Sequence, residues 1–151
     1  MLTLFELSEL LTALKCDYEI IQHNQPILKT EDASKYFDYS NTAPVFIIKT
    51  EKGFYALIVS NQYNRLDFKK LAQDLGFSKM KLAEKSDVLK ITGYEVGTIP
   101  LIGHNLPCLF DKRLLAFDYI YGGTGGQFQT LKINPKDVIR LNNNTVEIEI
   151  Q

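Results

Sequence analysis

The chain has 151 residues, of which 45% are hydrophobic and 23% are charged, and at this size we expect one compact domain spanning residues 1–151 with a substantial core. The formal net charge of −1 argues against a protein that binds nucleic acid through bulk positive charge, although it allows a local basic patch. The sequence shows neither an apolar run near the roughly 20 residues of a membrane span nor a secretory leader, which predicts a cytoplasmic protein without membrane contact.

The first predicted element is an amphipathic helix over residues 3–15. Thr3 followed by Glu6 has the form of a capping box, in which each side chain bonds the backbone N–H of the other residue at a helix start. Leucines recur along the segment at the spacing of one helical face, so we expect all of them to pack into the core. They are Leu4, Leu7, Leu10, Leu11 and Leu14.

A hairpin is the clearest strand prediction in the chain. The apolar runs 43–50 and 54–60 flank the segment Glu51-Lys52-Gly53, which has the composition of a tight turn. The first run suggests a strand that is buried on both faces. Two further elements are expected before the hairpin: a strand over residues 17–23 that ends at the polar His23, and a short helix over residues 31–39.

The remaining elements follow one another without a regular pattern. Gly76 and Gly93 each supply a helix stop, and Asn134 with Pro135 supplies a helix start. Hairpins mixed with helices, without strict alternation of strand and helix, favour an α+β fold with a mixed, mainly antiparallel sheet and packed helices. The expected elements are helices at 67–75, 84–91 and 135–141, and strands at 79–83, at two places within 106–121, at 128–133 and at 146–150.

Two glycine-rich segments occur in the second half of the chain. Residues 92–104 contain three glycines and a proline among apolar residues, which predicts a loop with a fixed backbone and free amides, or else a stiff connector between a helix and a strand. Residues 122–126 contain four glycines but lack the Lys-Ser/Thr of a phosphate-binding loop and the spacing of a dinucleotide fingerprint. Neither segment predicts a nucleotide site.

Few residues are candidates for acid–base or nucleophilic chemistry. His104 could transfer a proton near pH 7, or could fix the loop by a hydrogen bond to the main chain. It could also activate Cys108, four residues away, although Cys108 lies in what reads as a core strand. Cys16 and Cys108 have no zinc-ligand or disulfide pattern, so we expect two buried thiols and neither metal nor cofactor. No Gly-x-Ser-x-Gly elbow occurs, which argues against a nucleophilic hydrolase.

The chain resembles the YbaK/ProX family of aminoacyl-tRNA deacylases, the freestanding relatives of the editing domain of bacterial prolyl-tRNA synthetase. The resemblance covers roughly residues 17 to 150 and implies hydrolysis, in trans, of the ester that joins a wrong amino acid to the 3′ acceptor end of a tRNA, with tRNA(Pro)-type substrates foremost. The mischarged tRNA is then the partner, and an aminoacyl-tRNA synthetase is a second candidate partner. The segments that carry the resemblance are 92–97, 99–104, 106–107, Asp111 with Leu114 and Leu115, and 131–138.

The resemblance also implies which residues form the site. In relatives the main chain of the glycine–proline loop faces the aminoacyl ester, and a water molecule with the ribose hydroxyl of the substrate performs the attack. Loop amides would then stabilise the developing oxyanion, and pocket size would select the amino acid at about 1–3 kcal/mol per methylene. The implied substrate-binding residues are Gly97, Thr98, Ile99, Pro100, Gly103, Pro44 and Gly125, and His104 is the candidate catalytic group.

Two departures from the family pattern bear on activity. Relatives commonly carry a lysine where this chain has Pro44, and Lys49 matches a different, later lysine of the pattern. The family's loop proline corresponds to Leu101, with the proline here at position 100. Loss of the lysine leaves three readings: His104, Arg65 or Lys69 compensates; the domain is a weak or inactive binding module; or it works only beside a synthetase.

Overall fold

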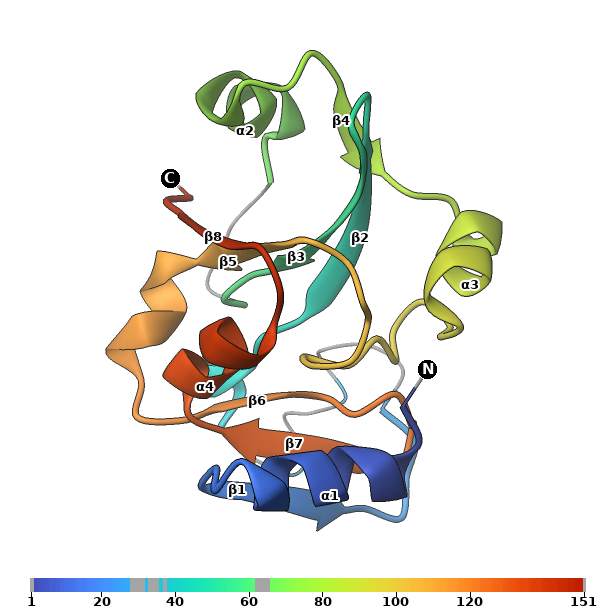
Figure 1. Cartoon of the computed structure of the whole chain (residues 1–151), viewed down its shortest axis with the longest axis vertical. Helices are drawn as coiled ribbons and strands as arrows, with labels where there is room; N and C mark the ends of the chain where they lie inside the picture. The colour runs from blue at the N-terminus through green and yellow to red at the C-terminus, as the bar shows by residue number, and fades with distance from the viewer. Residues whose placement is uncertain (1, 28–31, 33–35, 37, 62–65, 151) are drawn as a thin grey trace.

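The computed structural model describes residues 2–27, 32, 36, 38–61 and 66–150. Within these residues the chain forms four α-helices, two short 3₁₀ helices and eight strands (Figure 1). Their bounds are α1 Leu4–Ala13, β1 Tyr18–Gln22, η2 Tyr39–Asn41, β2 Val45–Thr50, β3 Gly53–Ile58, α2 Phe68–Leu75, β4 Met80–Leu82, α3 Lys85–Thr92, β5 Cys108–Asp111, η3 Lys112–Ala116, β6 Ile120–Gly123, β7 Gln129–Ile133, α4 Pro135–Leu141 and β8 Thr145–Ile148.

The strands form two sheets. The first has three antiparallel strands in the order β1-β7-β6, and the second has five strands in the order β4-β2-β3-β5-β8. In the second sheet β2 pairs antiparallel with β3 and β4, whereas β5 pairs parallel with β3 and β8. The predicted α+β fold with mixed, mainly antiparallel pairing is therefore confirmed.

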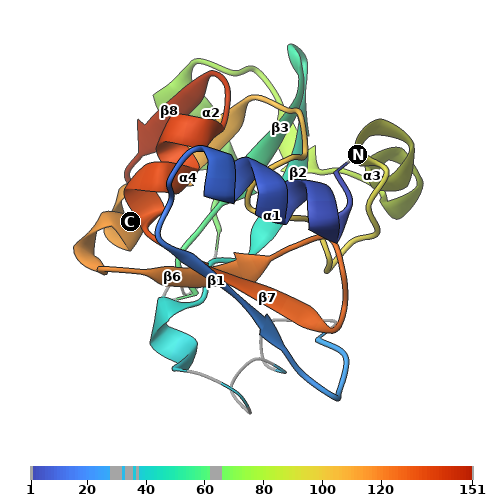
Figure 2. The ribbon, with the colours of Figure 1, turned by 60° about the horizontal axis from the view of Figure 1, so that its bottom comes forward.

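The helices cover different faces of these sheets. Figure 2 shows α1 lying across the three-stranded sheet with α4 nearby. Side chains from both helices, including Leu7 and Val138, pack with Ile58 and Phe110 of the five-stranded sheet and Leu131 of the three-stranded sheet in one core. α2 packs on one face of the five-stranded sheet and α3 packs on the opposite face. No helix in the described part of the chain is long and apolar enough to cross a membrane.

The predicted hairpin is confirmed. β2 and β3 pair from Val45 opposite Ile58 to Thr50 opposite Gly53, and Gly53 adopts a positive φ of 117° at the turn. Ile47 and Ile48 point to opposite faces and are both buried, as expected for a strand covered on both sides. The helix stops at Gly76 and Gly93 are also present, each residue in the left-handed region.

The α1 prediction was correct in position but wrong about the width of its buried face. The capping box of Thr3 and Glu6 is present, and Leu7 and Leu11 are fully buried. Leu10 and Leu14 are 36% and 40% exposed, and Leu4 is only partly buried. One side of α1 faces the core while the neighbouring side stays open, so leucine spacing alone overstated the contact.

Several other boundaries differ from the prediction. The second strand expected within 106–121 begins at Ile120, after η3 and residues 117–119, which belong to neither element. The final strand is Thr145–Ile148 rather than 146–150. Cys108 is fully buried as predicted, but Cys16 is only half-buried, where its sulfur accepts a hydrogen bond from Arg140. The helix expected over residues 31–39 lies mostly outside the described residues.

Candidate functional site

The loop that follows α3 is held in shape from its first residues. Gly93 ends α3 with φ of 80°, and the Thr92 hydroxyl donates to the carbonyl oxygen of Val88 at 2.6 Å. Gly97 has φ of 93°, and the backbone N–H and hydroxyl of Thr98 both donate to the Glu95 carbonyl, at 3.0 and 2.9 Å. A turn whose glycine adopts a positive φ therefore presents residues 98–101 in a fixed conformation.

The second glycine segment, residues 122–126, packs very closely against this loop. The backbone N–H of Leu101 donates to the carbonyl of Gly123 on β6, at 3.1 Å. A Cβ added at Gly123 would collide with the Ile99 carbonyl oxygen, and one added at Gly122 would collide with the Leu101 side chain. A Cβ at Gly125 would lie 2.5 Å from the Tyr94 ring. The absence of side chains on this segment is what lets the loop lie against β6.

Two further contacts tie the loop to segments distant in sequence. The Asn142 side-chain amide, just after α4, donates to the Leu101 carbonyl at 2.8 Å and to the Val138 carbonyl at 3.0 Å. The Tyr94 hydroxyl accepts from the Leu2 N–H at 3.0 Å and donates to the Leu2 carbonyl at 3.1 Å. Burial raises the pKa of Tyr94, so its hydroxyl stays protonated and able to donate.

His104 is buried and only 1% exposed. Its Nδ1 accepts the backbone N–H of Leu106 at 3.1 Å, so the ring proton belongs on Nε2. Burial lowers the pKa of His104 to about 4, and at neutral pH the ring is uncharged. Among the described residues no group accepts a hydrogen bond from its buried Nε2. The ring therefore shapes the main chain at 104–106, as an acceptor from an amide, and retains one unused donor.

Cys108 does not offer a second reactive group. Cys108 lies at the start of β5 and is fully buried in the core. Burial raises the pKa of its thiol to about 12. A thiol with this pKa is protonated at neutral pH, and a neutral His104 gives it no cationic neighbour. The arrangement therefore does not provide a thiolate nucleophile.

Pro44 lies next to β6, the strand to which the loop is hydrogen-bonded. Its carbonyl accepts the Val59 N–H at 3.1 Å, and the preceding Ala43 donates its N–H to the Tyr121 carbonyl on β6 at 2.8 Å. Val45 packs in the same apolar cluster as Ile99. β6 thus brings together the start of β2, loop residues 98–101 and the second glycine segment.

The three residues expected to compensate for the family lysine differ in their positions. His104 lies on the loop itself, whereas Lys69 lies on α2, which packs on the face of the five-stranded sheet opposite to Ile99. Arg65 lies outside the described residues. Within the part of the chain that the structure describes, no group of three or more His, Cys, Asp or Glu is arranged to hold a metal ion.

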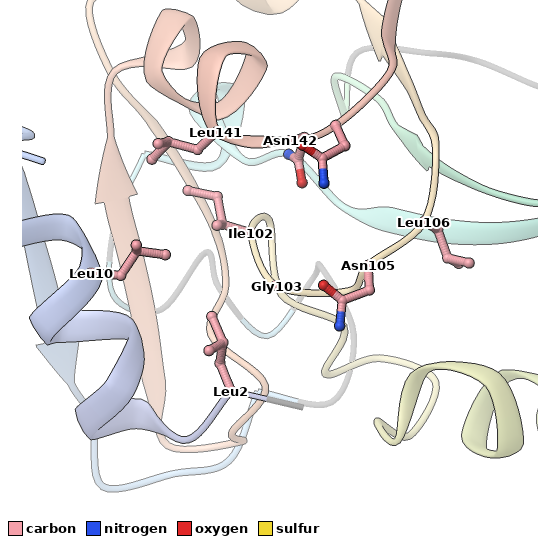
Figure 3. Close-up of a pocket in the computed structure, with 9 residues that line it drawn as sticks. Leu2, Leu10, Ile102, Gly103, Asn105, Leu106, Leu141 and Asn142 are labelled. Carbon is pink, nitrogen blue, oxygen red and sulfur yellow. The ribbon is translucent and has the colours of Figure 1, made fainter.

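A cavity of about 270 Å³ adjoins the later part of the loop (Figure 3). Of the predicted site residues, only Gly103 lines it, and a Cβ added there would lie 2.9 Å from the Leu2 side chain. The segment Gly97–Pro100 does not contribute to its wall. The lining residues are Leu2, Leu10, Ile102, Gly103, Asn105, Leu106, Leu141, Asn142 and Asn143.

Sequence reasoning missed Asn142, and it named Gly123 and Asp111 only as members of a glycine segment and of a family motif, without a positioning role. Asn142 and Gly123 fix Leu101 from two sides, and Asp111 fixes the end of β5. The Asp111 carboxylate is fully buried and accepts from the Arg113 guanidinium at 2.8 Å and from the Ser60 N–H at 2.9 Å. The local signals were an Asn at a helix end, a glycine-rich segment and an Asp two residues before an Arg, and none of them identifies a distant partner.

Comparisons with known proteins agree with this architecture. The family model described as the aminoacyl-tRNA editing domain matches residues 24–141. A hypothetical protein of known crystal structure superposes with a TM-score of 0.80 at 22% identity, covering 93% of this chain and 96% of that one. A protein proposed to be a trans-editing enzyme for prolyl-tRNA synthetase gives 0.78 at 22% identity, covering 89% and 86%.

A third structure shares the fold as part of a larger protein. This Marinobacter aquaeolei VT8 protein, described in terms of signal transduction, superposes with a TM-score of 0.64 at 12% identity. The match covers 93% of this chain but 30% of that one. At these identities the structural likeness shows a common fold.

Proposed function

The chain belongs to the aminoacyl-tRNA editing domain family, and from this we propose that it hydrolyses, in trans, the ester of a mischarged aminoacyl-tRNA, with tRNA(Pro) the foremost substrate. The observation that carries the proposal is the extent of the family match, which includes the loop, both glycine segments and the start of β2. These segments meet around β6, which supports a single substrate site there. The reaction needs no protein nucleophile, in keeping with the protonated Cys108.

The chemistry would come from main-chain donors. In the described part of the chain no group accepts a hydrogen bond from the N–H of Gly97 or of Ile99, while Thr98 and Leu101 are anchored on either side. Fixed amides aimed at an oxyanion stabilise the transition state. Removing one such donor costs about 3 kcal/mol of that stabilisation. We assign the attack to water together with the ribose hydroxyl of the substrate, and the oxyanion to these amides.

Selection of the amino acid would be steric. Thr98, Ile99 and Pro100 are all buried. Under this proposal they would form the pocket wall, and a rigid wall would favour small side chains such as those of Ala, Cys and Ser. Each additional methylene is discriminated by about 1–3 kcal/mol. His104 would act as a neutral donor through Nε2–H and as the residue that sets the main chain at 104–106.

Single-turnover deacylation tests the proposal directly. The substrates are tRNA(Pro) charged with Ala, Cys or Ser, and tRNA(Ala) charged with Ser, with correctly charged Pro-tRNA(Pro) as the control. We expect hydrolysis of at least one mischarged tRNA and none of the correct one. If folded protein accelerates none of the esters above the spontaneous rate, it is not a deacylase for these substrates.

A second candidate function rests on Pro44. With no cation at this position, the site would bind an aminoacyl end without cleaving it, and saturable binding of a mischarged tRNA without turnover would favour this function. Pro44→Lys restores a cation beside β6, and Pro44→Gln is the matched control that removes the proline without adding charge. Under this alternative we expect Pro44→Lys alone to gain hydrolysis by at least about tenfold, because a cation in a dry site stabilises developing negative charge.

A synthetase partner is compatible with either function. A domain that works beside a synthetase would form a stable complex with it, and deacylation would rise when the two are mixed. A pull-down of purified prolyl-tRNA synthetase with the tagged domain, repeated with an unrelated synthetase, measures this. Equal recovery of both synthetases would argue against a specific complex.

A further inference from the structure

Tyr94 lies where the loop meets two other parts of the chain. Its side chain is 5% exposed and packs in one apolar cluster with Ile99 of the loop and Val88 of α3. One edge of the ring lies against the second glycine segment, where a Cβ added at Gly125 would come within 2.5 Å of it. Packing on these sides fixes the ring, which gives its hydroxyl a defined position.

The hydroxyl of Tyr94 binds both main-chain polar groups of Leu2, a residue 92 positions earlier in the chain. It accepts from the Leu2 N–H at 3.0 Å and donates to the Leu2 carbonyl at 3.1 Å. Within the ranges that the structure describes, no other group bonds to this N–H or carbonyl. Donation requires the protonated phenol, and burial raises the pKa of Tyr94, so both hydrogen bonds form at neutral pH.

Leu2 also contacts the other end of the loop, through its side chain. A Cβ added at Gly103 would lie 2.9 Å from the Leu2 Cδ1, and both residues line the cavity beside the loop (Figure 3). One residue therefore contacts the loop at positions 94 and 103. These positions lie on either side of the segment 97–100, to which the proposed function assigns the substrate.

Leu2 is held in turn by α1. It directly precedes Thr3, whose capping box with Glu6 fixes the start of the helix. Leu2 is partly buried and packs against the cluster that contains Leu11 of α1. This whole segment precedes residues 24–141, which the family model matches. The loop is therefore supported by a part of the chain that lies before the matched region.

The two ends of the loop segment are fixed by different contacts. Tyr94 fixes the near end, and Leu101 fixes the far end through its hydrogen bonds to β6 and to the residue after α4. Between these two anchors, the N–H groups of Gly97 and Ile99 have no acceptor among the residues that the structure describes. The directions of these two amides therefore depend on both anchors.

We propose that Tyr94 is a positioning residue for deacylation, whose hydroxyl holds the start of the loop on Leu2 so that the amides of Gly97 and Ile99 point at the ester. This inference rests on the proposed function for the reaction that it serves. Tyr94 does not touch the substrate in this role and acts through the main chain of the loop. Stabilisation of an oxyanion depends on the direction of its donors, and a misplacement of about 1 Å can cost about a hundredfold in rate.

Single-turnover deacylation by Tyr94→Phe tests this role, with Tyr18→Phe as the matched control and the best mischarged tRNA of the wild type as substrate. Both substitutions remove one hydroxyl and keep the ring. The Tyr18 hydroxyl bonds to the side chains of Ser8 and Thr12 on α1, at 2.9 and 2.8 Å. For Tyr94→Phe we expect the maximal rate to fall at least about tenfold with little change in the half-saturating concentration, because the amides act in the transition state. Tyr18→Phe should change either value by less than about twofold.

Hydrogen exchange separates positioning from general stability and needs no substrate. The N–H groups of Thr98 and Leu101 are hydrogen-bonded, at 3.0 and 3.1 Å, and their exchange reports opening of the loop. We expect Tyr94→Phe to raise exchange of these two amides at least about tenfold more than exchange of the β2–β3 hairpin amides. Global destabilisation would instead raise the exchange of all slow amides by the same factor.

The two proposals fail in different ways. If Tyr94→Phe exchanges its loop amides and cleaves the ester as the wild type does, the positioning role is wrong and the deacylase function stands. A uniform rise in exchange, with a rate reduced only by the unfolded fraction, would also overturn the positioning role. If the wild type cleaves no ester but Tyr94→Phe alone opens the loop, the hydroxyl holds the loop as proposed and the deacylase function fails.

Discussion

At the scale of single residues, His104 shows how burial changes the chemistry that a histidine offers. Its position on the loop suggested either proton transfer near pH 7 or a structural hydrogen bond. The structure shows a ring that is 1% exposed, accepts from the Leu106 N–H and has a pKa of about 4. At neutral pH such a ring is an uncharged acceptor at Nδ1 and a donor at Nε2, and it carries no positive charge to replace the family lysine.

This burial predicts an acid-sensitive step in stability. The pKa of His104 is about 4 when folded against 6.5 for the free group, so the unfolded chain takes up a proton first as pH falls. The contribution of neutral, buried His104 to the free energy of unfolding is therefore complete above pH 6.5 and is lost progressively toward pH 4. Between pH 7.5 and 4.5 we expect a loss of about 2–3 kcal/mol in the free energy of unfolding from this residue.

Urea unfolding at these two pH values measures the effect in the wild type and in His104→Asn. Asn retains an acceptor for the Leu106 N–H but does not titrate. The variant should be less stable at pH 7.5, yet it should lose about 2–3 kcal/mol less than the wild type on acidification. Equal losses in the two proteins would show that His104 is not held neutral by burial.

At the scale of elements, the contact between the loop 92–104 and the second glycine segment, residues 122–126, depends on glycine at three positions. We expect Gly123→Ala to be harmful, because its Cβ would meet the Ile99 carbonyl oxygen, a main-chain atom that moves only with the whole loop. Overpacking of this kind costs about 1–3 kcal/mol of stability. Displacement of Ile99 should also lower single-turnover deacylation by more than tenfold.

Gly126→Ala is the control for this substitution. The Cβ at Gly126 would meet the end of the Gln129 side chain, which rotates away at little cost. Thermal unfolding and deacylation should therefore change little in Gly126→Ala. A Gly123→Ala protein with wild-type stability and rate would mean that the loop tolerates displacement, and that its fit to β6 does not set the site.

Local elements were predictable and long-range fit was not. Gly76 and Gly93 predicted helix ends, and the turn Glu51-Lys52-Gly53 predicted the hairpin, because these signals act within a few residues. The pairing of the two glycine segments joins residues more than twenty positions apart, and no local pattern encodes it. The sequence indicated a loop that approaches something closely. That β6 is one of the things it approaches became clear only from the fold.

At the scale of the whole molecule, one core joins the two sheets, and part of it comes from outside the matched family region. The family model begins at residue 24, yet Leu7 and Leu11 of α1 are 1% and 0% exposed. They pack in the cluster that contains Leu101 and Ile102 of the loop. Leucine spacing predicted α1 correctly, but only the packing distinguishes the two leucines that complete the core from the two that stay exposed.

This difference predicts a sharp contrast within one helix. Leu11→Ala should lower the free energy of unfolding by about 2–5 kcal/mol, because it leaves a cavity between the sheets beneath the loop. Leu14→Ala, at a position 40% exposed, makes the same chemical change and should cost less than about 1 kcal/mol. Urea unfolding of both variants at pH 7.5 measures the two values on one scale. Similar losses for the two would mean that α1 stabilises the protein through its helical propensity rather than through the core that supports the loop.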